Sequence, residues 1–278
     1  MNGLSSLIGG GPRAKATEVH ARASADFDAK LERTRAVLRE AATEFAAGAS
    51  GQPGKVTVTQ ASSLGAEDVV ITHLINSLAL DIPVFVLETG KLHTETLALL
   101  EKTQAESRAP VTVYRPVEAS VIQFVRREGQ DAMYKRIELR KACCGIRKME
   151  PLARALAGYG AWITGLRREQ STARAEVPLI DRSEAAEPNG RVKFNPLAEW
   201  TWGDVWHYIA TRHVPYNPLH DEFFPSIGCV PCTRAIALGE DFRAGRWWWE
   251  AELEGGAAKE CGLHVKKQDQ QHPEEVSA

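Results

Sequence analysis

Cysteine supplies the most informative chemistry in this chain of 278 residues, which contains five of them. Four form two close pairs: Cys143 is adjacent to Cys144, and Cys229 and Cys232 form a CxxC sequence. A CxxC turn directs two sulfurs at one point, and a second pair can complete a set of four metal ligands. The fifth, Cys261, stands apart from both pairs. The spacing predicts a metal site with four thiolate ligands and a separate thiol.

The ligand spacing favours an iron–sulfur cluster over a single metal ion. Zinc sites usually use two CxxC pairs, because adjacent cysteines rarely place both sulfurs on one ion. A cubane cluster has separate iron corners, so Cys143 and Cys144, which lie where a helical run meets Gly145, can each bind one. Arg147 and Lys148 follow closely and would offset the negative charge of four thiolates. Structural zinc and unligated thiols are the alternatives.

Cys261 has neighbours that suit a reactive thiol. A nucleophilic cysteine needs exposure, a lowered pKa and a cationic or hydrogen-bonding neighbour. Lys259 and His264 are the candidates, at the end of a Gly-, Ala- and Glu-rich stretch that we expect to be a mobile tail. Taken without the other motifs, Cys261 would be interpreted as an inert cysteine in a disordered segment.

A candidate phosphate loop lies at residues 62–68 (SSLGAED), where we expect a strand to give way to a helix. Amide groups at a helix N-terminus, with small hydroxyls such as those of Ser62 and Ser63, suit a phosphate. The loop is neither a P-loop nor a GxGxxG motif. By itself it fits an ordinary turn with serine caps better. Its position in front of a parallel sheet favours the functional interpretation.

A cationic segment follows much later in the chain. Arg243 and Arg246 are three residues apart, so both can face one anion. Arg174 adds positive charge near an expected strand end at Gly165. The tryptophans at 247–249 suit packing better than stacking on a base. Charged loops are usually only solvated, so these arginines become functional only if they converge on one pocket.

Hydrophobic patterning predicts the elements that position these residues. We expect strands at 55–60, 83–87, 111–114 and 161–164, and helices at 26–47, 69–78, 94–105, 119–127 and 202–213, the last one started by Thr201 or nearby acidic residues. Strands alternating with helices predict an α/β fold of three layers, with a parallel-type sheet and helices on both faces. Ligands bind such folds beyond the carboxyl ends of the strands, where 62–68, 88–90 and 164–168 lie. Beyond Asp181 the alternation stops.

Composition divides the chain into three parts. We expect a flexible N-terminal arm at 1–24, an α/β nucleotide-binding domain with the metal site at 25–240, and an Arg/Trp loop and tail at 241–278. Hydrophobic residues make up 44% and charged residues 25% of the chain, as in an ordinary globular protein. The size suits one large domain with a sizeable core.

The chain's net charge and its apolar runs limit the partners and the compartment that we expect. A net charge of −2 gives no global reason to expect nucleic acid or an anionic membrane as partner. No apolar run approaches the roughly 20 residues of a membrane helix. We expect no secretory signal, because no apolar stretch precedes a cleavage site at the N-terminus. Free cysteines at ligand spacing then favour a reducing cytoplasm.

Together the motifs resemble the assimilatory adenylyl-sulfate (APS) reductases, the iron–sulfur branch of the phosphoadenylyl-sulfate (PAPS)/APS reductase family. The resemblance covers about residues 30–265, and its marks are 143–152 (CCGIRKMEPL), 164–168 (TGLRR), 228–233 (GCVPCT), 243–248 (RAGRWW) and 260–264 (ECGLH). It implies an adenine nucleotide α-hydrolase-like fold, a [4Fe–4S] cluster and thioredoxin as reductant. The implied reaction converts APS to sulfite and AMP in sulfate assimilation and cysteine biosynthesis. Families of this kind are often homo-oligomeric.

The resemblance also implies roles at individual positions. The family's cluster ligands fall on the four paired cysteines, its nucleophile on Cys261 and the histidine of its closing tail on His264. Lys148 matches a lysine between cluster and substrate, and the phosphosulfate-binding arginines fall on Arg243 and Arg246. The remaining substrate-binding positions are Ser62, Ser63, Leu87, Gly165 and Arg174. Leu87 and Gly165 match positions that meet adenosine through backbone. Many relatives read SFSG where this chain has SSLG at 62–65.

The implied mechanism is nucleophilic. The Cys261 thiolate would attack the sulfur of APS, AMP would leave, and thioredoxin would release sulfite from the resulting S-sulfocysteine. The nearest alternative is the same reaction on PAPS, or on both nucleotides. A second is an ATP-using enzyme of the same fold, which would carry an SGGxDS-like loop that 63–68 is not. A third is a zinc-stapled nucleotide-binding module without redox catalysis.

Overall fold

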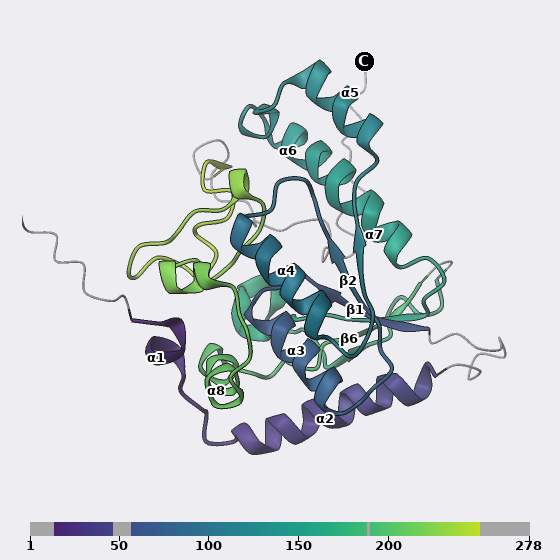
Figure 1. Cartoon of the computed structure of the whole chain (residues 1–278), viewed down its shortest axis with the longest axis vertical. Coiled ribbons are helices and arrows are strands. Elements are labelled where there is room, and N and C mark those ends of the chain that lie inside the picture. The colour runs from purple at the N-terminus through teal and green to yellow at the C-terminus, as the bar shows by residue number, and fades with distance from the viewer. Residues whose placement is uncertain (1–13, 47–56, 188–189, 251–278) are drawn as a thin grey trace, which may run out of the picture.

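A six-stranded sheet runs through the protein in the computed structural model, which describes residues 14–46, 57–187 and 190–250 (Figure 1). The spatial order of the strands is β3-β2-β1-β4-β6-β5. Their bounds are β1 Val58–Ser62, β2 Val84–Leu87, β3 Val111–Tyr114, β4 Ala161–Ile163, β5 Ile180–Asp181 and β6 Val192–Phe194. The sheet confirms the predicted α/β class.

Strand pairing is parallel except at one edge. β1 pairs with β2 and β4, β2 pairs with β3, and β4 pairs with β6, all in parallel. β5 is antiparallel to β6, with Ile180 opposite Phe194. These two short strands extend the sheet past the point where the predicted alternation stops. β1 also runs on to Ser62, because Ala61 and Ser62 pair with Phe85 and Val86.

Eight α-helices surround the sheet in the described ranges. They are α1 Ala16–His20, α2 Phe27–Glu44, α3 Ala66–Ser77, α4 Thr94–Glu106, α5 Glu118–Glu128, α6 Ile137–Cys144, α7 Glu150–Ala155 and α8 Trp202–Arg212. Short 3-10 turns lie at Ala132–Tyr134, Arg168–Gln170, Thr172–Arg174, Pro218–Glu222 and Val230–Cys232. None of these helices is both long enough and apolar enough to cross a membrane.

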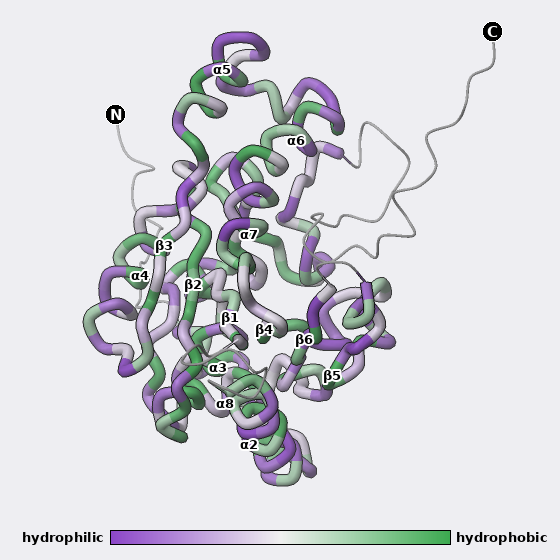
Figure 2. The backbone as a smooth tube through the Cα atoms, turned by 90° about the vertical axis from the view of Figure 1, so that its right-hand side faces the viewer, coloured by the Kyte–Doolittle hydropathy of each residue, from purple (hydrophilic) through white to green (hydrophobic). Residues whose placement is uncertain are grey.

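The helices cover both faces of the sheet, as the patterning predicts. Successive residues of a strand point to opposite faces. Val86 accordingly joins the core that α2, α3, α4 and α8 build on one face, whereas Phe85 and Trp162 pack with Leu152 of α7 on the other. Figure 2 follows this pattern, with hydrophobic colouring along β2 and α3. The three layers hold the carboxyl ends of β1, β2 and β4 at one edge.

The N-terminal segment predicted as a flexible arm is described from residue 14. There α1 packs on α8, and the side chain of Ala16 is buried. The Ala16 amide donates to Asp221 Oδ1 at 2.7 Å, and the Ser24 amide donates to Asp204 Oδ1 at 2.7 Å. Asp204 also completes the capping box of Thr201, the residue that starts α8 as predicted. Residues 14–24 therefore lie against the domain.

The helix that carries Cys143 and Cys144 does not end at Gly145, where the sequence suggested a boundary. Gly145 has right-handed helical angles, φ −53° and ψ −53°. A π-helical turn, Gly145–Met149, joins α6 directly to α7. Such turns hold one extra residue and are frequent at functional sites. Here the turn carries Lys148, which lines a pocket at the strand ends and whose charge acts on Cys232.

Candidate functional site

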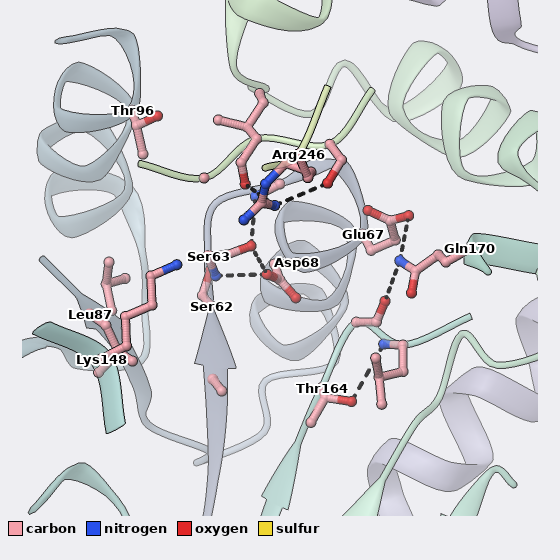
Figure 3. Close-up of a pocket in the computed structure, with 18 of the residues that line it drawn as sticks. Ser62, Ser63, Glu67, Asp68, Leu87, Thr96, Lys148, Thr164, Gln170 and Arg246 are labelled. Carbon is pink, nitrogen blue, oxygen red and sulfur yellow. Dashed lines mark hydrogen bonds between the residues drawn. The ribbon is translucent and has the colours of Figure 1, made fainter. Parts of the chain in front are cut away.

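A pocket of about 220 Å³ lies at the carboxyl ends of β1, β2 and β4 (Figure 3). Its walls come from the turn after β1, from Leu87 and Thr89 after β2, and from Thr164 and Gly165 after β4. Residues 225–228 and 242–246 close it from above the sheet. The chain order of the sheet reverses between β1 and β4, and such a reversal opens a crevice where α/β folds bind ligands.

All the described residues predicted for the nucleotide meet in this pocket. They are Ser62, Ser63, Leu87, Lys148, Gly165, Arg174, Arg243 and Arg246. Five separate segments supply them, so their convergence is a property of the fold. Cys261 and His264 lie outside the described residues, and their predicted roles stay predictions.

The turn after β1 is held by its own side chains. Ser63 donates to Asp68 Oδ2 through its amide at 2.7 Å and its hydroxyl at 2.6 Å, and Ser62 Oγ accepts from the Leu64 amide at 3.2 Å. Leu64 has a left-handed backbone (φ 61°) and a buried side chain. Glu67 and Asp68 occupy the first turn of α3, so the positive end of that helix already faces carboxylates. Binding of an anionic group therefore depends on the cations across the pocket.

Asp68 is packed tightly against the end of β4. Burial raises the pKa of its carboxyl group to about 6, although hydrogen bonds from Ser63 and the Gly165 backbone oppose the rise. A Cβ atom on Gly165 would lie 2.5 Å from Asp68 Oδ1 and 2.9 Å from Glu67 Cβ. Only glycine fits there, so this wall of the pocket presents bare backbone.

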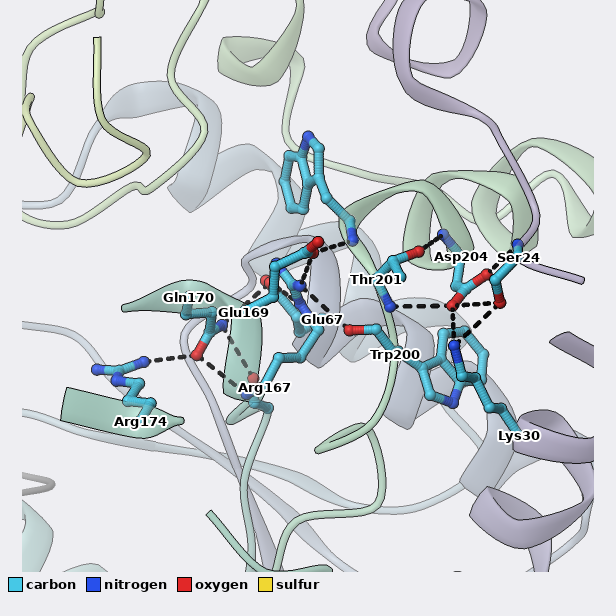
Figure 4. A network of polar contacts seen from close by, with 12 residues as sticks. Ser24, Lys30, Glu67, Arg167, Glu169, Gln170, Arg174, Trp200, Thr201 and Asp204 are labelled. Atoms are coloured by element: carbon cyan, nitrogen blue, oxygen red, sulfur yellow. Dashed lines mark hydrogen bonds and ion pairs between the residues drawn. The ribbon is translucent and has the colours of Figure 1, made fainter. Parts of the chain in front are cut away.

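A buried network supports the same wall (Figure 4). Arg167 Nε donates to Glu67 Oε1 at 2.8 Å, and Gln170 Nε2 donates to the same oxygen at 3.0 Å. Burial alone would raise the pKa of Glu67, but the charge and hydrogen bond of Arg167 outweigh it and the pKa is lowered. Gln170 Oε1 in turn accepts from Arg174 Nη1 at 2.6 Å. The network therefore orients Arg174 beside the pocket.

Arg246 approaches the pocket from the segment after residue 240. Its Nη1 donates to Ser226 Oγ at 3.1 Å, and its guanidinium lies 4.8 Å from the ring centroid of Trp247. Its Nε is buried and has no hydrogen-bond partner among the described residues. Trp247 is buried beside Cys229 and Cys232, which confirms the packing role predicted for this tryptophan. Arg246 therefore lies at the pocket with its guanidinium held by Ser226 and Trp247.

The paired cysteines gather beside this pocket. Cys143, Cys229 and Cys232 pack in one cluster with Trp247, and Cys144 is half-buried next to Cys143. Thr89 Oγ1 lies 3.2 Å from Cys229 Sγ. Among the described side chains no group of three or more His, Cys, Asp or Glu forms a site for a single metal ion.

The buried thiols differ from ordinary free cysteines. Burial raises the pKa of Cys232 to about 12, Cys229 adds to the rise, and Lys148 and Arg246 oppose it. Burial also raises the pKa of Cys143, against the charge of Arg147. Thiolates in this place need a strong positive partner, and a bound metal centre supplies one. The donor set fits a thiolate-ligated centre.

Several residues of the pocket were not predicted from the sequence. Gln170 is neutral and lies in a 3-10 turn, where no pattern distinguishes it. Thr89 lies in the 88–90 segment expected at the strand ends, but no role was predicted for its side chain. His220 is also buried in the pocket wall, against Trp206 at 5.2 Å between ring centroids. Burial lowers the pKa of His220 to about 4, so the ring is neutral near pH 7. A buried histidine has no sequence signature that separates it from an exposed one.

Comparisons with known proteins match most of this chain. Residues 57–235 match the family model of the phosphoadenosine phosphosulfate reductase domain. Proteins named adenosine 5'-phosphosulfate reductase are similar over most of the chain. The one from Allochromatium vinosum is 48% identical, covering 78% of this chain and 84% of its own, and the one from Burkholderia cepacia is 51% identical, covering 74% and 79%.

A solved structure shares the fold. The crystal structure of phosphoadenylyl-sulfate reductase from Candida auris, in a phosphate complex, superposes with a TM-score of 0.57 at 26% identity. The match covers 75% of this chain and 97% of the other.

The raised pKa of Asp68 leads to a test of the pocket's electrostatics. Since folding favours its protonated form, its stabilising contribution is complete below about pH 4 and is lost as the pH rises to about 6. The free energy of unfolding of the wild type should therefore fall, relative to Asp68→Asn, by on the order of 2 kcal/mol across this window. Urea denaturation at several pH values measures the difference.

Asp28→Asn removes an exposed carboxyl group in the first turn of α2 and is the matched control for the change of charge. If the difference between the wild type and Asp68→Asn depends no more on pH than the difference for Asp28→Asn, the raised pKa of Asp68 is contradicted.

Proposed function

This chain belongs to the phosphoadenosine phosphosulfate reductase family, and from this premise we propose that it reduces APS to sulfite and AMP with electrons from thioredoxin. The family assignment makes the chain an oxidoreductase. One observation carries the proposal: a single pocket at the strand ends joins every described residue predicted for the nucleotide and lies beside the buried cysteines.

The pocket's two ends suit the two parts of the substrate. Leu87 ends β2, and Gly165 lies just after β4. The backbone groups there and the apolar walls from Phe85 and Trp162 suit an adenosine. Lys148 and Arg246 lie toward the cysteines and suit the anionic phosphosulfate. Charge grows on the phosphate oxygen as the S–O bond breaks, and fixed cations stabilise that charge.

We assign the paired cysteines, Cys143, Cys144, Cys229 and Cys232, as ligands of a [4Fe–4S] cluster. Three of them, Cys143, Cys229 and Cys232, pack in one cluster beside the pocket, which supports a shared centre. A cubane spreads its ligands over four corners, so they need not point at one ion. When bound, the cluster would supply positive charge and hold α6 against the CxxC turn; no change in its redox state is needed.

The proposed chemistry balances through two thiol steps. The Cys261 thiolate attacks the sulfur of APS; an S–S bond forms, the S–O bond breaks and its electron pair leaves with AMP. A thioredoxin thiolate then attacks the Cys261 sulfur and expels sulfite, and the second thioredoxin thiol resolves the mixed disulfide. Thioredoxin leaves oxidised by two electrons. His264, on the same tail, is proposed to act at the closed site.

The cellular compartment proposed for the reaction follows from its thiols. Free cysteines and a thioredoxin partner suit a reducing cytoplasm.

PAPS is the second candidate substrate, because the Candida auris structure is of a PAPS reductase. The curated relatives at 48% and 51% identity carry the APS name, and they favour APS. Comparing turnover of the two nucleotides at equal concentration distinguishes the candidates.

Removal of the proposed nucleophile tests the function. Cys261→Ser should reduce thioredoxin-dependent sulfite release by at least about 10³-fold, since a hydroxyl is far less nucleophilic than a thiolate at neutral pH. Binding of AMP should stay within about twofold of the wild type. Sulfite is assayed after addition of APS and reduced thioredoxin, and AMP binding by calorimetry. Turnover retained in Cys261→Ser would contradict the assignment.

Metal analysis tests the cluster separately. The purified protein should contain about four iron and four acid-labile sulfide per chain and show a brown visible absorption. Cys229→Ser should lose most of the iron, whereas Cys261→Ser should keep it. A colourless protein with one zinc per chain would instead support the zinc-stapled alternative.

A further inference from the structure

Arg140 and Glu250 form a buried ion pair that lies outside the pocket. Arg140 Nε donates to Glu250 Oε1 at 2.6 Å, and its Nη2 donates to Oε2 at 3.0 Å. The side chains are only 5% and 8% exposed. Neither residue lines the pocket. A bidentate arginine–carboxylate pair fixes both distance and orientation, so it joins its two segments rigidly.

The pair connects two segments with different roles. Arg140 belongs to α6, one turn before Cys143. Glu250 ends the described part of residues 241–250, here called the arginine segment, which carries Arg243 and Arg246. The partners are 110 positions apart in the chain, so this is a tertiary connection. It ties the proposed anion-binding arginines to the helix of the proposed cluster ligands.

The arginine segment is attached to the rest of the protein along its length. At its start, Phe242 packs on Trp202 with ring centroids 4.9 Å apart. Its middle is held by backbone hydrogen bonds, from the Arg234 amide to the Gly245 carbonyl at 3.0 Å and from the Trp247 amide to the Cys232 carbonyl at 3.3 Å. Its end is held by the ion pair of Glu250 with Arg140. Trp247 has a left-handed backbone, φ 45°, which an L-residue keeps only when its surroundings enforce it.

Arg140 also contacts the Trp247 ring, against which Arg246 of the pocket packs. Its guanidinium lies 4.7 Å from the Trp247 ring centroid, and that of Arg246 lies 4.8 Å from the same centroid. A continuous series of contacts therefore runs from Glu250 through Arg140 and Trp247 to Arg246. Beyond Trp247, a Cβ on Gly228 would lie 2.4 Å from Arg246 Nη2, so the guanidinium has little room to move.

We propose that Arg140 and Glu250 are a positioning pair for the substrate's anionic group. By fastening the arginine segment to α6, they hold Arg246 and Arg243 at the pocket before the nucleotide binds. Donors held in place lose less entropy when an anion arrives, so affinity for the phosphate increases without any contact to it from the pair. The inference rests on the proposed function only in taking the anion to be a nucleotide phosphate.

Two nucleoside probes separate positioning from general stabilisation. AMP carries a phosphate that the arginines would meet, whereas adenosine lacks it. Calorimetry on the full chain, purified with its native cofactor, measures both affinities. In Glu250→Gln we expect AMP affinity to fall about tenfold, because the arginine segment loses its fixed end, while adenosine affinity stays within about twofold.

The chain offers a matched control in the pair Arg234–Glu240. It is also bidentate, at 2.9 and 2.7 Å, and it lies in the neighbouring loop, but it is partly exposed and does not line the pocket. Glu240→Gln should leave both affinities unchanged. If Glu250→Gln does not fold, Arg140→Lys keeps the buried positive charge but loses the bidentate geometry, and the same fall in the AMP-to-adenosine affinity ratio is expected.

The outcomes are distinct. If the wild type prefers AMP, two results in Glu250→Gln overturn the positioning role: a parallel loss of AMP and adenosine affinity, or an unchanged AMP-to-adenosine affinity ratio. Either result leaves the proposed function intact. A wild type that does not prefer AMP over adenosine overturns the phosphate site itself, and this inference with it. Restoration of the ratio in the exchanged double variant Arg140→Glu/Glu250→Arg would support the pair directly.

Discussion

A buried ion pair between Glu67 and Arg167 determines the shape of the site. It spans the point where the sheet's chain order reverses, joining the turn after β1 to the turn after β4 at 2.8 Å. Two charges are stable in such a place only when further hydrogen bonds satisfy them. Gln170 donates to Glu67, and the Trp200 carbonyl accepts from Arg167. The turns come so close that only glycine fits at position 165.

The charged residues around this pair give the pocket a negative side and a positive side. The carboxyl groups of Glu67 and Asp68 occupy the positive end of α3, so the pocket's negative side lies just beyond the end of β1. The cations come from elements that follow later in the chain: Lys148 from the π-helical turn and Arg246 from the segment that packs on the cysteines. A nucleotide would therefore bind with its base toward the sheet and its anionic end toward the cysteines.

The sequence predicted the bounds of several elements well. β3 lies at its expected bounds and α4 within one residue of them, because their apolar residues recur at the spacing typical of a strand and of a helix. β5 and β6, of two and three residues, are too short to show one. Gly145 suggested a helix end, but its backbone keeps helical angles and a π-helical turn follows it directly. Gln170 and His220 acquire their places only from tertiary neighbours, and neutral side chains give no such signal.

Peptide mass spectrometry tests most directly whether Cys261 takes the sulfonyl group. Reduced protein is mixed with APS in the absence of thioredoxin and then digested. We expect the peptide that contains Cys261 to gain the mass of one SO₃ group, and to lose it as sulfite when reduced thioredoxin is added. An unmodified Cys261 peptide in protein that has released AMP, or an SO₃ group on any other peptide, would contradict the mechanism.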